Sequence, residues 1–110
     1  MRQSGILAAA ALWALDHNVA RLQDDHAHAR LLAELLADCA ALRPVRPESN
    51  IVMVDLVRER DTAEAVVSKL AQAGLLVVPF GARRLRAVTH LDVGREDIEQ
   101  AAQIVARALA

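Results

Sequence analysis

The sequence Arg-Leu-Arg-Ala-Val-Thr-His-Leu-Asp-Val occupies residues 84–93. From residue 86 to residue 91, Arg86, Val88 and His90 alternate with Ala87, Thr89 and Leu91. This period of two is typical of a β-strand. A strand holds an arginine in a fixed direction, and the planar guanidinium is the side-chain group best suited to bidentate binding of a carboxylate. The segment therefore predicts a strand over residues 86–91 and makes Arg86 the first candidate for a binding residue.

Two further strands are expected upstream of this one. Residues 50–57 are rich in β-branched side chains, and residues 75–78 form a short apolar run that Pro79 closes. The loop between residues 78 and 86 is short enough for antiparallel pairing of the strands on either side. The sequence thus predicts a three-stranded, mainly antiparallel sheet.

Helices are predicted between and after these strands. Asp61 is the expected cap of a helix over residues 62–73, with Glu64 at the reciprocal position of a capping box and Gly74 as the terminator. A last helix is expected over residues 94–108. Its apolar side would hold Ile98, Ala102, Val105 and Leu109.

The first part of the chain is predicted to form two helices. Residues 3–15 are apolar on nearly every face, so we expect this helix to be buried against another subunit or domain. After the polar residues 16–18, a second helix carries an apolar stripe made of Val19, Leu22, His26, Ala29, Ala33, Leu36 and Ala40. Its polar positions, largely off that stripe, are Arg21, Asp24, Asp25, Glu34 and Asp38.

Pro44 and Pro47 are expected to end this helical region and to mark a linker. The chain then divides into a helical segment over residues 1–43, which would lie at a subunit interface, and an α/β domain over residues 44–110. The fold class is α+β, with the helices packed on one face of the sheet.

Composition excludes several classes of function. The net charge is −1 and no basic block is present, so nucleic-acid binding is not expected. No apolar run is long enough for a membrane span. Residues 5–15 resemble part of a signal peptide, but polar residues and an amphipathic helix follow directly, which argues against that alternative. The single cysteine, Cys39, favours a reducing cytoplasm.

Residues 84–93, together with Met-Arg-Gln-Ser-Gly-Ile-Leu-Ala-Ala-Ala at residues 1–10, resemble the closing part of low-specificity L-threonine aldolases. These are pyridoxal-phosphate lyases of amino-acid metabolism with fold type I, the fold of aspartate aminotransferase. The resemblance runs over essentially all of this chain but covers only the last third of the family's. It implies the small carboxyl-terminal domain of a cytoplasmic homo-oligomer that binds a small amino-acid substrate.

The resemblance implies roles for two arginines. Arg86 would bind the α-carboxylate of the substrate; the alternative is a surface arginine in an arginine-rich stretch, because Arg83 and Arg84 are close by. Arg2 would lie near the cofactor phosphate, although the glycine run that precedes it in the family is absent here. The catalytic residues, including the Schiff-base lysine, belong to the family's upstream large domain, so none is expected here.

Other chemically reactive side chains have simpler explanations. His90 and Asp92 lie two apart on the expected strand and so on one face, but we interpret His90 as structural. His26 and His28 diverge by about 200° around a helix, which argues against a shared metal ion, and no metal site is predicted. Lys69, the only lysine, lies mid-helix and outside the family's cofactor-lysine context.

The first hypothesis is therefore a domain of an L-threonine aldolase, which cleaves L-threonine or L-allo-threonine to glycine and acetaldehyde with pyridoxal phosphate. Taken alone, these residues are expected to be inactive. One alternative is a non-enzymatic module that self-associates through its apolar first helix. Another is the small domain of a different fold type I lyase.

Overall fold

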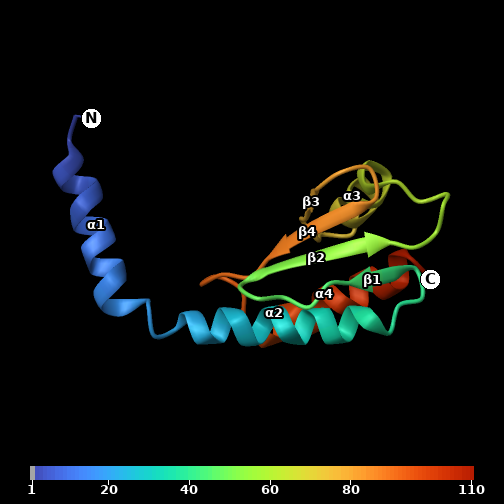
Figure 1. Cartoon of the computed structure of the whole chain (residues 1–110), viewed down its shortest axis with the longest axis horizontal. Helices are drawn as coiled ribbons and strands as arrows, with labels where there is room; N and C mark the ends of the chain where they lie inside the picture. Colours follow the sequence, from blue (N-terminus) through green and yellow to red (C-terminus); the bar gives the residue numbers. More distant parts are fainter. Residues whose placement is uncertain (1) are drawn as a thin grey trace.

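The computed structural model describes residues 2–110, and Met1, with which the first predicted segment begins, lies outside them. Figure 1 shows a sheet with α2 and α4 along one side and α1 extending away from the rest of the chain. The elements follow in the order α1 (Ser4–His17), α2 (Leu22–Ala37), β1 (Leu42–Pro44), β2 (Ile51–Leu56), α3 (Ala63–Gln72), β3 (Val78–Pro79), β4 (Arg84–Val88) and α4 (Arg95–Ala108).

The strands form one sheet in the order β1-β2-β4-β3, and every neighbouring pair is antiparallel. The predicted α+β class with a mainly antiparallel sheet is confirmed. The predicted number of strands was wrong, because β1 lies where the prolines suggested a linker. Pro44 pairs with Val54 at the end of this edge strand, and the next residue, Val45, supplies a backbone hydrogen bond to the Met53 carbonyl at 2.8 Å. A proline is tolerated there because an edge strand does not need every N–H. β1 also spans positions 43 and 44, the predicted boundary between the helical segment and the α/β domain; that division stays a prediction.

The bounds of the last two strands also differ from those predicted. The run over residues 75–78 is mostly not a strand, because the Leu75 N–H still bonds to the Leu70 carbonyl of α3 at 2.9 Å. β4 begins at Arg84, which pairs with Asp55, and ends at Val88, which pairs with the first residue of β2. The predicted strand over residues 86–91 was therefore placed too late in the chain.

The third helix has a different cap from the one predicted. The N-cap is Thr62, whose hydroxyl accepts a hydrogen bond from the Ala65 N–H at 3.3 Å, and not Asp61. The predicted terminator, Gly74, is confirmed: its φ of 93° lies in the left-handed region that glycine adopts readily. Asp97 accepts a hydrogen bond from the Gly94 N–H at 2.9 Å and so helps to begin α4.

A single hydrophobic core lies between the sheet and α2, α3 and α4. The predicted apolar side of α4 faces it, with Ile98, Val105 and Leu109 buried. Alternate residues of the two central strands supply the other wall, namely Val52, Val54, Leu56 and Leu85. The opposite face of the sheet has no helix over it in the described part of the chain.

Asp25 is a correction to the predicted stripe of α2. It was placed among the polar positions, yet it is 2% exposed. Its carboxylate forms an ion pair with Arg21 at 2.7 Å, and its carbonyl accepts a hydrogen bond from the buried Thr89 hydroxyl at 2.7 Å. The ion pair compensates for part of the cost of burying this charge. Val19, the first residue of the predicted stripe, is 51% exposed.

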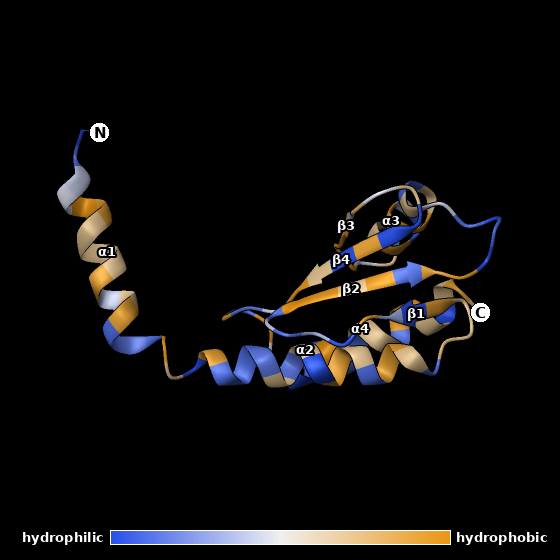
Figure 2. Ribbon diagram, in the orientation of Figure 1, coloured by the Kyte–Doolittle hydropathy of each residue, from blue (hydrophilic) through white to orange (hydrophobic). Residues whose placement is uncertain are grey.

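The first helix has no buried residue within the described chain. Ile6, Leu12, Trp13 and Leu15 are each more than half exposed, and Figure 2 shows apolar residues along most of the helix between its polar ends. The sequence predicts that another domain or subunit covers this helix, and that stays a prediction. None of the described helices combines the length and the hydropathy needed to cross a membrane.

Candidate functional site

The open face of the sheet carries Arg86, the first candidate binding residue, and its neighbour Arg84. Because side chains alternate along a strand, residues of β2 and β4 that do not enter the core all point to this face. They are Ile51, Met53, Asp55, Arg84, Arg86 and Val88, all of them partly or largely exposed. Arg86 thus lies in the second central strand, on the side away from the helices.

Arg83 belongs to the loop before β4 and has a structural role. Its guanidinium donates to the carbonyls of Leu56 at 3.2 Å and Glu59 at 3.3 Å, and also to that of Arg58. These bonds hold the segment that leaves β2. Arg83 is therefore not free to bind a ligand through the same donors.

Arg84 also has a partner within the fold. Its Nε lies 2.6 Å from Asp55 Oδ1, and its Nη2 donates to Asp55 Oδ2 at 3.0 Å. The hydrogen bonds and positive charge of Arg84 lower the pKa of Asp55 below its ordinary value, and the nearby charge of Arg43 acts in the same direction. The same bonds raise the pKa of Arg84.

Arg86 differs from both neighbours. It is half-buried, and its Nε is shielded from solvent without a hydrogen-bond partner among residues 2–110. Met53 and Val78 pair with it on either side, and its guanidinium carbon lies 5.9 Å from the centre of the Phe80 ring. A desolvated donor among apolar side chains binds an anion more strongly than the same donor in water. Because the shielded Nε is out of reach of a ligand atom, this geometry suits a carboxylate that accepts from the terminal nitrogens.

The structure does not bring Arg2 near Arg86. Arg2 is exposed and precedes α1, whose beginning lies at the far end of the molecule from the sheet (Figure 1). Lys69 is exposed on α3, and the buried side of α3 belongs to the core on the opposite face of the sheet. The described residues therefore do not by themselves form a binding site for pyridoxal phosphate.

The histidine candidates do not belong to a metal site, since residues 2–110 contain no group of three or more His, Cys, Asp or Glu side chains that could hold a metal ion. His90 and Asp92 follow β4 and are not on the strand as predicted; the Asp92 N–H donates to His90 Nδ1 at 3.2 Å, and both residues are exposed. This contact supports a local structural role for His90, since it fixes the turn into α4. In α2, the Nδ1 atom of His28 is shielded from solvent and has no hydrogen-bond partner among the described residues.

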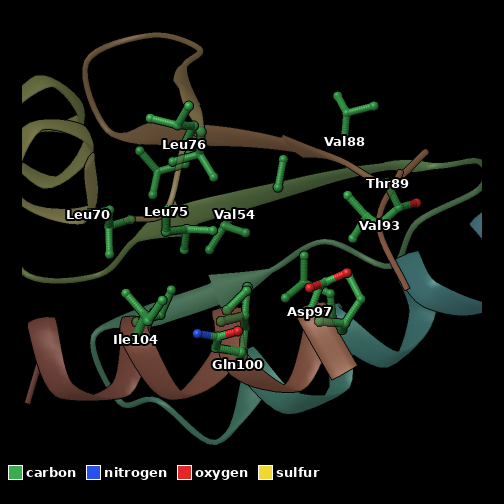
Figure 3. A pocket seen from close by; sticks show the side chains of 18 of the residues that line it. Val54, Leu70, Leu75, Leu76, Val88, Thr89, Val93, Asp97, Gln100 and Ile104 are labelled. Carbon is green, nitrogen blue, oxygen red and sulfur yellow. The ribbon is translucent and has the colours of Figure 1, made fainter. Parts of the chain in front are cut away.

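A separate cavity of about 460 Å³ lies on the helix side of the sheet. Figure 3 shows Val54, Leu70 and Leu75 on one wall and Gln100 and Ile104 of α4 on the other. Its lining is mainly apolar, and Arg86 is not part of it. The cavity is therefore distinct from the arginine on the open face.

Two residues of the open face were not predicted from the sequence. They are Asp55 and Phe80, for which the sequence pattern indicated no binding role. The missing information was the register, because Asp55 meets Arg84 and Phe80 approaches Arg86 only after β2, β3 and β4 are aligned. Gly81 directly follows Phe80, and glycine is a sequence signal for a turn; in the structure its φ is 107°.

Comparison with known proteins gives close relatives among the threonine aldolases. The chain is 43% identical over 102 residues to a probable low-specificity L-threonine aldolase 2 of Arabidopsis thaliana, an alignment that covers 90% of this chain and 29% of that protein. It is 41% identical over 102 residues to the low specificity L-threonine aldolase of Escherichia coli, covering 93% and 29% respectively. The chain thus spans less than a third of the length of these relatives.

Solved structures show the same fold at lower sequence identity. An ornithine aminotransferase from Plasmodium yoelii matches with a TM-score of 0.67 and 17% identity, over 78% of this chain and 24% of that one. A Lactobacillus brevis glutamate decarboxylase matches with a TM-score of 0.63 and 17% identity, over 78% and 22%. The predicted small-domain fold of fold type I enzymes is confirmed. The profile of the beta-eliminating lyases matches residues 1–59. With more than half of its residues matched by that profile, the chain belongs to the beta-eliminating lyase family.

Proposed function

We propose that these residues form the carboxyl-terminal domain of a low-specificity L-threonine aldolase and that Arg86 binds the α-carboxylate of the amino-acid substrate. The whole enzyme would cleave L-threonine or L-allo-threonine to glycine and acetaldehyde with pyridoxal phosphate. The identities of 41–43% to threonine aldolases over most of the chain support this assignment over other lyases of the family.

The observation that carries the role of Arg86 is the contrast among three nearby arginines. Arg83 is bonded to backbone carbonyls and Arg84 to Asp55, whereas Nε of Arg86 is buried without a partner in the described chain. The terminal nitrogens of Arg86 likewise form no hydrogen bond or ion pair within the described chain, so they stay available to a carboxylate. This favours a ligand site over the alternative of a surface arginine.

No step of the cofactor chemistry is assigned to this chain, because its described residues do not fit the cofactor by themselves. Arg2 would reach a phosphate only if a neighbouring domain or subunit met the beginning of α1. We therefore propose that residues 1–110 alone do not cleave threonine. Their contribution is to hold the substrate carboxylate, which fixes the orientation of the bonds at the α-carbon.

Self-association is part of the proposal. The exposed apolar helix α1 favours a homo-oligomer, because apolar side chains on every face gain stability when another surface covers them. The same observation favours the second candidate, a non-enzymatic module that self-associates. Cys39, free and half-buried, is compatible with a reducing compartment such as the cytoplasm.

A chimeric enzyme tests the proposal. Residues 1–110 replace the matching segment of the Escherichia coli low specificity L-threonine aldolase, to which they align over 102 residues. We expect the chimera to cleave L-threonine and residues 1–110 alone to be inactive. A folded, cofactor-loaded chimera with no cleavage would contradict the enzymatic proposal and leave the self-associating module as the better account.

A further inference from the structure

Phe80 is placed beside Arg86 by the backbone of two strands. Its N–H donates to the Arg84 carbonyl at 2.8 Å, and the residue two before it, Val78, pairs with Arg86. Val78 and Phe80 therefore share the open face of the sheet with Arg86, since alternate strand residues point the same way. The ring lies diagonally across from Arg86, within the reach of an aromatic side chain.

The guanidinium carbon of Arg86 lies 5.9 Å from the centre of the Phe80 ring, within the range of a cation–π contact. Phe80 is 51% exposed, so packing in the core does not explain its position. A contact with a ring face holds a guanidinium without using any of its N–H donors. The donors of Arg86 are therefore left for a ligand, in contrast to those of Arg84, which bond to Asp55.

We infer that Phe80 is a positioning residue, which holds the Arg86 guanidinium against its ring so that its terminal nitrogens face an incoming carboxylate. Phe80 acts through Arg86 and does not itself bind the carboxylate. The inference rests on the proposed function, because it requires Arg86 to be a carboxylate-binding residue. It predicts that an apolar side chain of similar size without a ring does not replace Phe80.

The test is a titration of the full ¹⁵N-labelled chain with sodium acetate, followed by NMR at the arginine Nε–Hε signals. The Arg86 signal is assigned by its loss in Arg86→Gln, and Arg84, bonded to Asp55, serves as an internal reference. We expect the Arg86 signal to shift saturably with acetate. In Phe80→Leu and Phe80→Met the apparent dissociation constant should rise about twofold to fivefold, the effect of losing a surface cation–π contact.

Controls separate positioning from general structure. Phe80→Tyr, which keeps the ring, should restore the wild-type dissociation constant. Leu76→Ala, at a residue 83% exposed, should leave it unchanged. Unaltered amide shifts of Val52 and Val54, both in the core, show that the variants are folded.

The outcomes also distinguish the two proposals. If acetate does not shift the Arg86 signal of the wild-type chain, the carboxylate-binding role itself is wrong, and the role of Phe80 falls with it. If the signal responds equally in the wild type, Phe80→Leu and Phe80→Met, Arg86 remains a binding residue and the positioning role of Phe80 is overturned.

Discussion

Arg84 and Asp55 face each other directly across β2 and β4, and two hydrogen bonds of 2.6 and 3.0 Å join their side chains. The hydrogen-bond donors of Arg84 on this side of the guanidinium are thus occupied by Asp55, a residue of the same fold. Arg86, two residues later on the same face, meets apolar partners instead. This difference between two arginines of one strand underlies the functional proposal.

The ion pair makes stability depend on pH. Arg84 lowers the pKa of Asp55 below the ordinary value of 3.8, so the pair stabilises the fold above that pH, where the carboxylate is charged in both states. This contribution is lost as the pH falls through the lowered pKa. We expect urea unfolding between pH 7 and pH 2 to show a smaller acid-induced loss of stability in Asp55→Asn than in the wild type. Parallel profiles for the two proteins would show that the ion pair has no such role.

The buried Thr89 hydroxyl connects the end of β4 to α2. It donates to the Asp25 carbonyl at 2.7 Å, and Thr89 is 1% exposed. Thr89→Val keeps the shape but removes the donor, so we expect the free energy of unfolding to fall by about 1–3 kcal/mol. Thr89→Ser keeps the hydroxyl and should lose less. Equal losses in urea unfolding of the two variants would show that the hydrogen bond contributes little.

Exposure of α1 predicts self-association of the chain. Sedimentation velocity at micromolar concentration should show a dimer or a larger species. Leu12→Glu places a charge on a helix position that is now 61% exposed and should shift the population toward monomer. The matched control is Gln103→Glu, at an exposed position of α4, which should have no effect. A wild-type chain that sediments as a monomer would refute this prediction.

Lys69 should not form a specific Schiff base with pyridoxal phosphate. It is exposed on α3, away from the open face of the sheet. After treatment of the chain with one equivalent of pyridoxal phosphate and then borohydride, peptide mass spectrometry should find no stoichiometric adduct at Lys69, as in the control Lys69→Arg. A stoichiometric reduced adduct there would show that Lys69 had been wrongly excluded as the cofactor lysine.

Local sequence pattern predicted those elements whose signal lies within a few residues. The β-branched residues of β2 and the apolar side of α4 needed no knowledge of the rest of the chain, and Gly74 ends α3 because its φ of 93° suits glycine. Position 86 was correctly placed in a strand, although that strand begins and ends earlier than predicted.

Features that depend on tertiary contacts were missed. β1 forms because β2 pairs with an edge strand despite Pro44. Asp25 is buried because Arg21 pairs with its carboxylate and the Thr89 hydroxyl donates to its backbone carbonyl. The contact between Phe80 and Arg86 likewise needs the register of β3 and β4. Sequence pattern gives the direction of a side chain relative to its own strand, but not the residues that approach it from another.

The most direct measurement compares two arginine variants in the chimera with the Escherichia coli enzyme. Arg86→Gln should raise KM for L-threonine roughly 10- to 100-fold, as expected for the loss of charged hydrogen bonds to a carboxylate. Arg84→Gln, on the same face and strand, should leave KM near the wild-type value, because Arg84 is bonded to Asp55. An unchanged KM in Arg86→Gln, or equal increases in both variants, would contradict the account.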